Sequence, residues 1–262
     1  MKIAVCIKQV PDTAATLRVK PDKSGIMEDN VKFVVSPYDE FAVEEALRTK
    51  DKIPGSDVVA ITVGPKKSQE ALRNVLAMGC DRAIHVNTDG QAGIDSLAVA
   101  KLLAAQLKEE GSELAFTGRH AVDDDNAQVS QMLAEFLSWP HVTVVNKFTL
   151  EADNKKARVE RPIEGGSKEI WEVDLPAVIA ATKGLNEPRY ASLKGIMQAK
   201  SKPLKEVPVL QAGVPVTELA PKVVWSNYEL PPERKAGKVF KDAPEKAVEE
   251  VVRLLREEAK VI

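Results

Sequence analysis

The 262-residue sequence is poor in cysteine and in aromatic residues. Of its two cysteines, Cys6 lies in an apolar strand pattern and Cys80 follows a helical pattern. Neither belongs to a Cys-x-x-Cys motif, so the sequence indicates buried thiols in a reducing compartment and not a disulfide scaffold. Aromatic residues make up 5% and the net charge is −2, which together argue against a nucleic acid polymer as a ligand.

Long apolar runs are also missing. No run approaches the ~20 residues of a membrane span, so direct membrane insertion is not expected. The apolar N-terminal stretch, residues 2–8, is too short for a signal peptide and resembles a strand. The sequence therefore favours a cytoplasmic protein of bacterial type without a targeting peptide.

The usual catalytic and cofactor motifs are not found. There is no Gly-x-Gly-x-x-Gly after a strand pattern and no Gly-x-x-x-x-Gly-Lys-Ser/Thr loop. His85, His120 and His141 lie in separate segments without metal-ligand spacing. Because no Ser/His/Asp or Cys/His arrangement is visible either, we expect no catalytic residue and no metal site.

Strand and helix patterns alternate through the first two thirds of the chain. This order predicts an α/β fold, Rossmann-like and suited to adenine nucleotides, in which a mostly parallel sheet carries helices on both faces. The expected strands are 2–8, 57–63, 83–86, 113–117 and 176–182, and the expected helices are 36–50, 68–79, 95–110 and 126–138. A ligand crevice would lie at the carboxyl ends of the strands, near Lys8, Gly64 and Gly118.

The remaining segments change character. Period-two alternation over 142–173 predicts an antiparallel insertion or extension within a domain of residues 1–200. Many prolines interrupt 201–262 before a terminal amphipathic helix at 245–260. We interpret 201–262 as a C-terminal arm, which is either a linker or a strap around a partner.

Residues 118–131 form the best polar constellation, since they join a strand to a helix. Asp125, or Asp124, is a plausible N-cap, which would leave the amides of residues 126–129 free to bind an anion. Three consecutive carboxylates would repel a phosphate unless they turn away, and Lys8 and Arg119 are candidate counter-charges. The alternative is a solvated acidic loop with a well-capped helix.

A second segment, residues 185–200, has the composition of a recognition element. Pro188 suits the first position of a helix, and the apolar and basic residues that follow would lie on its surface. On spacing alone, an ordinary amphipathic helix is the favoured explanation of this pattern.

Several passages resemble the beta subunit of electron transfer flavoprotein, and the resemblance runs along the whole chain. They are Val19-Lys-Pro-Asp-Lys23, Ala42-Val-Glu-Glu-Ala46, Leu76 to Arg82, Gly118 to Gln131, Val159 to Gly166, Leu175-Pro-Ala-Val178 and Leu185 to Lys200. The most specific are Asn186-Glu-Pro-Arg-Tyr-Ala191 and Ile196-Met-Gln-Ala-Lys200.

The resemblance implies a heterodimer with an alpha subunit that holds most of the redox FAD, while the beta chain buries an AMP. The implied AMP contacts are Cys6, Ser36, Pro37, Tyr38, Asp39, Val63, Gly118, Arg119, His120, Ala121, Val122, Asp123, Asp124, Asp125, Asn126, Ala127, Gln128 and Val129. The phosphate would rest on the amides of the last three of these residues.

The resemblance also implies a carrier that takes electrons from acyl-CoA-type or other flavin dehydrogenases and passes them to a membrane quinone oxidoreductase or similar acceptor. Leu193 would insert into a dehydrogenase pocket. The whole expected docking set is Arg189, Tyr190, Leu193, Lys194, Ile196, Met197 and Lys200.

Two departures from the family and two alternatives bear on this interpretation. Val129 replaces a threonine found in some members, and Thr13 stands near the expected flavin instead of an aromatic residue. A bifurcating member would carry a second FAD in place of AMP, but the bulk and charge of Asp124 favour AMP. A free-standing adenine-nucleotide-binding module, or an adenylating enzyme of the same layout, is the other alternative.

Overall fold

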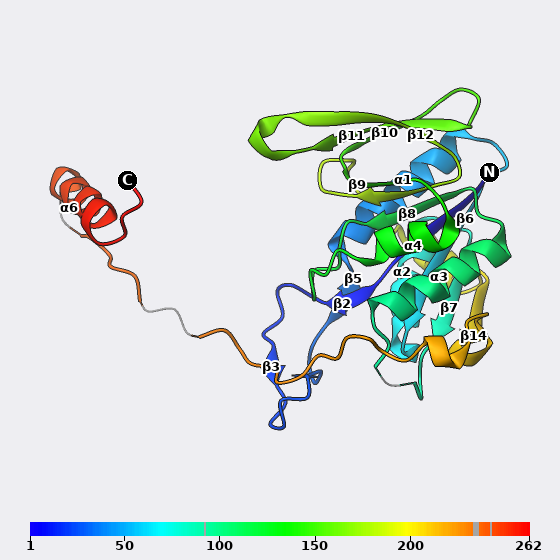
Figure 1. The fold of residues 1–262 in the computed structure, drawn as a ribbon, viewed down its shortest axis with the longest axis horizontal. Coiled ribbons are helices and arrows are strands. Elements are labelled where there is room, and N and C mark those ends of the chain that lie inside the picture. The colour runs from blue at the N-terminus through cyan, green and yellow to red at the C-terminus, as the bar shows by residue number, and fades with distance from the viewer. Residues whose placement is uncertain (92, 233–235, 242) are drawn as a thin grey trace.

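The computed structural model describes residues 1–91, 93–232, 236–241 and 243–262. Within this part of the chain, seven strands form one sheet in which every neighbouring pair is parallel. Across the sheet the order is β14 (Leu204–Pro208), β7 (Arg82–Asn87), β6 (Asp57–Gly64), β1 (Lys2–Cys6), β8 (Leu114–Gly118), β13 (Ala177–Ala181) and β9 (His141–Val145). The predicted α/β fold with a parallel sheet is thereby confirmed (Figure 1).

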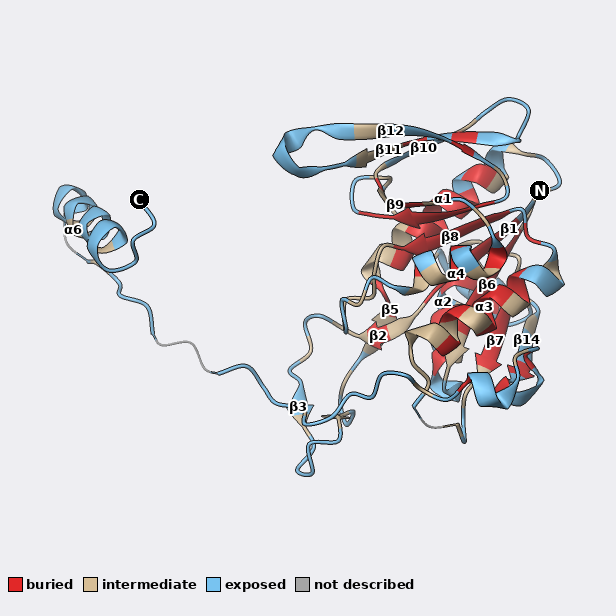
Figure 2. Ribbon diagram, in the orientation of Figure 1, coloured by how far each residue is buried: buried red, intermediate tan, exposed pale blue. Residues whose placement is uncertain are grey.

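Helices cover both faces of this sheet. On one face lie α1 (Pro37–Lys52) and α2 (Gln69–Met78), and on the other lie α3 (Ser96–Glu110) and α4 (Val129–Leu137). Alternate residues of β1 serve the two cores, because successive side chains of a strand point to opposite faces. Ile3 and Val5 pack toward α1 and α2, while Ala4 and Cys6 pack toward α3 and α4. Figure 2 shows the resulting buried layer on the strands and inner helix faces.

A three-stranded antiparallel sheet lies beside the main sheet. It consists of β10 (Lys147–Leu150), β11 (Lys156–Pro162) and β12 (Lys168–Asp174). The sequence predicted antiparallel structure from residue 142 onward, but the strand pattern is interrupted at Asn146, shortly after Val144 adopts a φ of 60°. Its first half is β9, which pairs in parallel with β13, so the antiparallel insertion begins later than expected.

Two small ribbons precede the first helix. One pairs β2 (Gln9–Pro11) with β5 (Phe33–Val35), and the other pairs β3 (Arg18–Val19) with β4 (Ile26–Met27). Short 3-10 turns lie at Lys66–Ser68, Glu164–Gly166, Val209–Gln211 and Val216–Glu218.

The starts of three helices can be compared with the predicted ranges. Helices α1 and α3 begin one residue after the expected positions 36 and 95: Pro37 occupies the first turn of α1, and Asp95 caps α3 by accepting from the amide of Ala98 at 3.0 Å. The predicted start of α4 is wrong, because Asp125 and Ala127 have φ angles of 50° and 49° and interrupt the helix. Gln128 is therefore the N-cap residue, and α4 begins at Val129.

The C-terminal part leaves the domain later than the expected boundary after residue 200. Residues 204–208 are β14, an edge strand of the main sheet, and Leu219 is buried against the core. Beyond it the chain runs past the β3–β4 ribbon to α6 (Pro244–Glu257), which stands apart from the body (Figure 1). Residues 233–235 and 242 of the predicted arm lie outside the described residues. Among the helices that are described, none is long and apolar enough to cross a membrane.

Candidate functional site

A cavity of about 560 Å³ opens at the carboxyl ends of the central strands. It lies beside β1, which has β6 and β7 on one side and β8 and β13 on the other. The strand order reverses direction at β1, so this is the topological switch point of the sheet. Cys6 ends β1, Val63 and Gly64 end β6, and Gly118 ends β8. The crevice is therefore at the predicted edge of the sheet.

Most of the predicted cofactor residues line this cavity. They are Cys6, Asp39, Val63, Gly118, Arg119, His120, Ala121, Asp124, Asn126, Ala127, Gln128 and Val129. The remaining ones lie around it: Val122 and Asp123 line a neighbouring cavity, and Ser36, Pro37, Tyr38 and Asp125 line neither.

Sequence reasoning missed a whole wall of the cavity. The segment after β7 contributes Thr88, Asp89, Gly90, Gln91, Gly93, Ile94, Asp95 and Ser96, and α3 contributes Val99 and Leu103. Thr117 and Ser130 also belong to the lining. The strand-end rule that identified Gly64 and Gly118 applies equally to the end of β7, so it could have found Thr88 and its successors.

Asp39 fastens two strand ends together beneath the cavity. One carboxylate oxygen accepts from the amide of Lys8 at 2.7 Å, and the other accepts from the amide of Gly118 at 2.9 Å. Burial raises the pKa of Asp39 to about 7, although both amide hydrogen bonds act to lower it. The side chain thus joins α1 to the ends of β1 and β8. Residue 118 must be a glycine, because a Cβ there would lie 2.4 Å from Asp39 Oδ1.

One lysine pairs with two of the three carboxylates of the acidic loop. Lys8 Nζ lies 2.8 Å from a carboxylate oxygen of Asp123 and 2.9 Å from one of Asp124, which confirms Lys8 as a counter-charge. Burial alone would lower the pKa of Lys8, but these ion pairs outweigh it and raise the pKa. Asp125 turns away toward His120 Nε2, 3.2 Å distant.

Arg119, the other candidate counter-charge, is held differently. Its guanidinium carbon lies 4.7 Å from the centre of the Tyr38 ring, and His120 meets the same ring edge-on at 4.6 Å. In the described chain, Arg119 Nε is buried and has no hydrogen-bond partner. Tyr38 therefore supports two cavity residues from outside the cavity.

Backbone donors gather where α4 begins. The first turn of the helix leaves amides of residues 129–131 without intrahelical partners. Just before the helix, Ala127 has a φ of 49° and Gln128 has right-handed helical backbone angles. This change from left-handed to right-handed backbone turns successive amides toward one side. Thr117 Oγ1 is buried in the lining and has no partner among the described residues. These groups can bind an anionic, polar ligand by donating hydrogen bonds to it.

A larger cavity of about 970 Å³ adjoins the first one. Its walls come from the ribbons between residues 9 and 33 and from residues 223–228. Asp95 and Asp124 line both cavities. Asp95 Oδ2 also accepts from the amides of Lys222 and Val223, at 2.6 and 3.2 Å, so the start of the C-terminal arm is tied to the cavity rim.

The recognition segment is extended where a helix was predicted. Pro188 does not begin a helix; α5 (Leu193–Ala199) begins after Ser192, whose hydroxyl accepts from the amide of Gly195 at 3.0 Å. Leu193 is 84% exposed and Tyr190 is 97% exposed, and Ile196 and Met197 are exposed beside them. Apolar side chains therefore project from this surface without a covering element in the described chain.

The basic residues of the segment divide into two groups. Lys194 and Lys200 are exposed. Arg189 instead forms ion pairs with Glu44 and Asp51 of α1.

Among the described residues, no three His, Cys, Asp or Glu side chains lie close enough together to hold a metal ion.

Comparison with known proteins assigns the chain to a family. Residues 24–212 match the model of the electron transfer flavoprotein domain. The chain is 41% identical over its whole length to "Electron transfer flavoprotein subunit beta, mitochondrial" of Arabidopsis thaliana, and the match covers all of that protein. It is 44% identical to "Electron transfer flavoprotein subunit beta" of Mus musculus, over 90% of this chain and 91% of the relative.

These relatives contradict one sequence prediction and establish the family. A further relative from Oryza sativa subsp. japonica, 43% identical over both full lengths, also carries a mitochondrial name, so the expected bacterial-type cytoplasmic location is wrong. Isolated cysteines and a strand-like N-terminus do not distinguish cytoplasm from the interior of a mitochondrion. Matches of this identity over the whole length show that the chain belongs to the electron transfer flavoprotein family, as a beta subunit.

Proposed function

We propose that this beta subunit buries a structural AMP in the cavity at the strand ends, pairs with an alpha subunit that holds most of the redox FAD, and docks dehydrogenase partners through residues 185–200. The complex takes electrons from acyl-CoA-type or other flavin dehydrogenases and delivers them to a membrane quinone oxidoreductase or similar acceptor. No bond of an organic substrate changes in this chain. The observation that carries the proposal is the cavity of about 560 Å³ at the switch point.

The residues of the cavity fit a mononucleotide. Its volume lies within the ~300–1,000 Å³ range of small-molecule sites. A phosphate would accept from the amides of Ala127, Gln128 and Val129, where the helix dipole of α4 also favours negative charge. Lys8 offsets one of the two negative charges of Asp123 and Asp124, which reduces their repulsion of a phosphate and keeps both side chains turned toward the lysine.

The ion pairs of Asp124 also support AMP over a second FAD. Its side chain lines the cavity and is held by Lys8 beside the amides proposed for the phosphate. A diphosphate would bring a second negative group toward this carboxylate, at a Coulombic cost. AMP requires only one such group.

Release of the nucleotides from the purified heterodimer tests this proposal. We expect one AMP and one FAD per heterodimer after denaturation and chromatography. Two FAD and no AMP would replace the proposal with an electron-bifurcating subunit.

The docking function rests on the exposed apolar residues of α5 and the turn before it. A single apolar anchor, Leu193, with Lys194 and Lys200 around it, suits a transient interface with a core and a polar rim. Leu193→Ala should slow reduction by the dehydrogenase without changing the flavin content. Leu210→Ala, at an exposed leucine outside the segment, is the matched control. Unchanged transfer kinetics in Leu193→Ala would refute the docking function.

The C-terminal arm supports the partnership with the alpha subunit. Val248, Val252 and Leu255 of α6 are exposed, so the helix has an apolar face without a covering element in the described chain. The chain purified alone should be colourless and prone to self-association, because the apolar face of its arm lacks the alpha subunit. A stable lone chain that hydrolyses ATP would instead favour a free-standing nucleotide-binding enzyme.

A further inference from the structure

Helix α1 contacts both the cavity, through Asp39, and the docking segment (residues 185–200), toward which it carries two buried acidic residues. Glu44 and Glu45 are 3% and 5% exposed in the middle of the helix. Buried carboxylates are rare unless they are paired, because ionised groups lose hydration in the interior. Their partners therefore indicate what the helix holds on this side.

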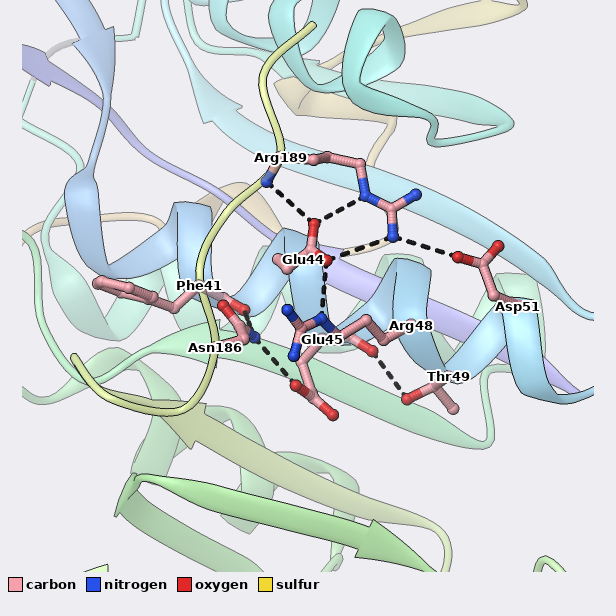
Figure 3. Close-up of polar contacts among 8 residues, drawn as sticks. All are labelled: Phe41, Glu44, Glu45, Arg48, Thr49, Asp51, Asn186 and Arg189. Atoms are coloured by element: carbon pink, nitrogen blue, oxygen red, sulfur yellow. Dashed lines mark hydrogen bonds and ion pairs between the residues drawn. The ribbon is translucent and has the colours of Figure 1, made fainter.

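Glu44 receives three hydrogen bonds from a single residue of the docking segment (Figure 3). Arg189 donates to its carboxylate from Nε at 2.8 Å, from Nη2 at 3.3 Å and from the backbone amide at 3.2 Å. Arg48 Nε, one helical turn further along α1, donates to Glu44 Oε1 at 2.8 Å. Arg189 Nη2 also reaches Asp51 at 3.1 Å. The guanidinium fork, and not just its charge, fits this arrangement.

A second tie lies three residues earlier in the segment. Asn186 Nδ2 donates to the carbonyl of Phe41 at 3.0 Å and to Glu45 Oε2 at 2.9 Å. Residues 186–191 donate no backbone–backbone hydrogen bond in the described chain. Side-chain contacts to α1 therefore hold this stretch, because no helix or strand does so.

We infer that Glu44 and Arg189 form a positioning clamp that fixes the docking segment on α1 before a partner binds. This inference rests on the docking function proposed above. Tyr190 follows Arg189 directly, and Leu193 lies four residues beyond the amide that Glu44 holds. A segment fixed in this way loses less conformational entropy when the partner binds, so the partner binds more tightly.

The ionisation of Glu44 agrees with this role. Burial acts to raise its pKa, but the hydrogen bonds from Arg189 and Arg48 outweigh burial, and the pKa lies below its usual value. The carboxylate is therefore ionised wherever the protein works near neutral pH. Burying it without Arg189 would leave a charge paired with Arg48 alone.

A different role for Arg189 would be to attract an acidic partner by charge. The two roles predict different results for Arg189→Lys. Lysine keeps the positive charge at the rim, so steering would survive. It cannot reproduce the fork that holds Oε1 and Oε2 of Glu44 together with Asp51, so the clamp would open.

The test uses the intact heterodimer and a flavin dehydrogenase, and measures KM and kcat for the flavoprotein as electron acceptor. We expect Arg189→Lys and Glu44→Gln each to raise KM about tenfold with little change in kcat. The double variant should be no worse than either single variant, because both remove the same contact. Lys183→Gln, at an exposed lysine outside the docking set, is the matched control and should keep the original KM.

Each result has a distinct meaning. An unchanged KM in Arg189→Lys, together with slower transfer in Leu193→Ala, would overturn the clamp alone. Normal kinetics in Leu193→Ala would overturn the docking function itself. If a clamp variant yields no folded heterodimer, Asn186→Ala keeps every charge and should raise KM in the same direction. Hydrogen exchange of the Arg189 amide, which donates to Glu44, should then speed up in Asn186→Ala while α1 stays protected, and unchanged exchange of that amide would overturn the clamp.

Discussion

At the scale of single residues, Asp39 is where burial and hydrogen bonding oppose each other most directly. Its carboxylate joins the amides of Lys8 and Gly118, yet burial raises its pKa to about 7. A carboxyl whose pKa is higher in the folded than in the unfolded protein stabilises the fold most at low pH. Its contribution is therefore full below about pH 4 and is lost as the pH rises through about 7.

This predicts a pH dependence that can be measured. The free energy of unfolding of the heterodimer should contain a component that falls between about pH 4 and pH 7. Denaturant titrations at a series of pH values measure it. Asp39→Asn should remove that component, because an amide does not titrate, and should lower stability by ~1–3 kcal/mol because one backbone donor loses its acceptor. An identical pH slope in Asp39→Asn would assign the component to another group.

Gly195 marks the closest approach of α5 to α2. A Cβ at this position would lie 2.3 Å from the carbonyl oxygen of Ala77. Gly195→Ala should therefore push α5 away from α2 and cost ~1–3 kcal/mol, measured by chemical unfolding. Gly25→Ala is the matched control, since nothing lies within 4 Å of its Cβ. Equal stability of the two variants would mean that α5 shifts without cost.

Residue types predicted some of these roles and not others. Lys8 could be predicted as a counter-charge because three neighbouring aspartates require a cation near the same strand end. The two amides that bind Asp39 could not be predicted, because they belong to residues 31 and 79 positions away in the sequence. Arg189 was expected on a basic rim, and its pairing with Glu44 likewise depends on a contact across 145 residues.

At the scale of secondary-structure elements, Asp95 has two functions. Oδ1 caps α3 through the amide of Ala98, and Oδ2 accepts from the amides of Lys222 and Val223. Burial acts to raise the pKa of Asp95, but these amides hold it below its usual value. The carboxylate therefore ties the arm to α3 throughout the neutral range and releases it only in acid, as the pH falls through the lowered pKa.

Two variants separate these functions. Asp95→Ala should cost ~1 kcal/mol through the lost cap and also free the arm. Asp95→Ser keeps one oxygen for the cap, so it should free the arm with a smaller loss of stability. Hydrogen exchange of the amides of residues 222 and 223 reports the release. Persistent protection of both amides in Asp95→Ser would show that other contacts hold the arm.

The element boundaries show where local patterns fail. The starts of α1 and α3 could be predicted to within one residue, because Pro37 and Asp95 act within the first turn. For α4, two residues with positive φ delayed the start, which a local preference for aspartate at the N-cap does not reveal. The break at Asn146 has the same origin, since β9 is held by β13 from a distant part of the chain.

At the scale of the whole molecule, the alternation of strands and helices was enough to predict a parallel sheet with a crevice at its carboxyl edge. The alternation did not predict the order of the strands in the sheet. The segment of β14 was assigned to the arm because of its prolines. Its place beside β7 depends on pairing across more than a hundred residues, which composition does not encode.

Removal of α6 tests the partnership at this scale. No residue of α6 is buried, so a chain that ends after residue 241 should keep the stability of its α/β domain. Its affinity for the alpha subunit should fall at least tenfold, measured by titration of the separated subunits. A truncated chain that binds the alpha subunit normally would make the arm a simple linker.

The two edges of the main sheet have a consequence for the chain before it meets its partner. Open edges recruit other strands and lead to aggregation. The β14 edge carries Lys205, Glu206 and Pro208, residues that discourage further pairing, and the β9 edge is closed where the amide of Asn146 bonds to the carbonyl of Glu160. The main sheet of a newly made beta chain is therefore poorly suited to edge-to-edge pairing, and self-association before the partner binds should proceed through exposed apolar surfaces such as the face of α6.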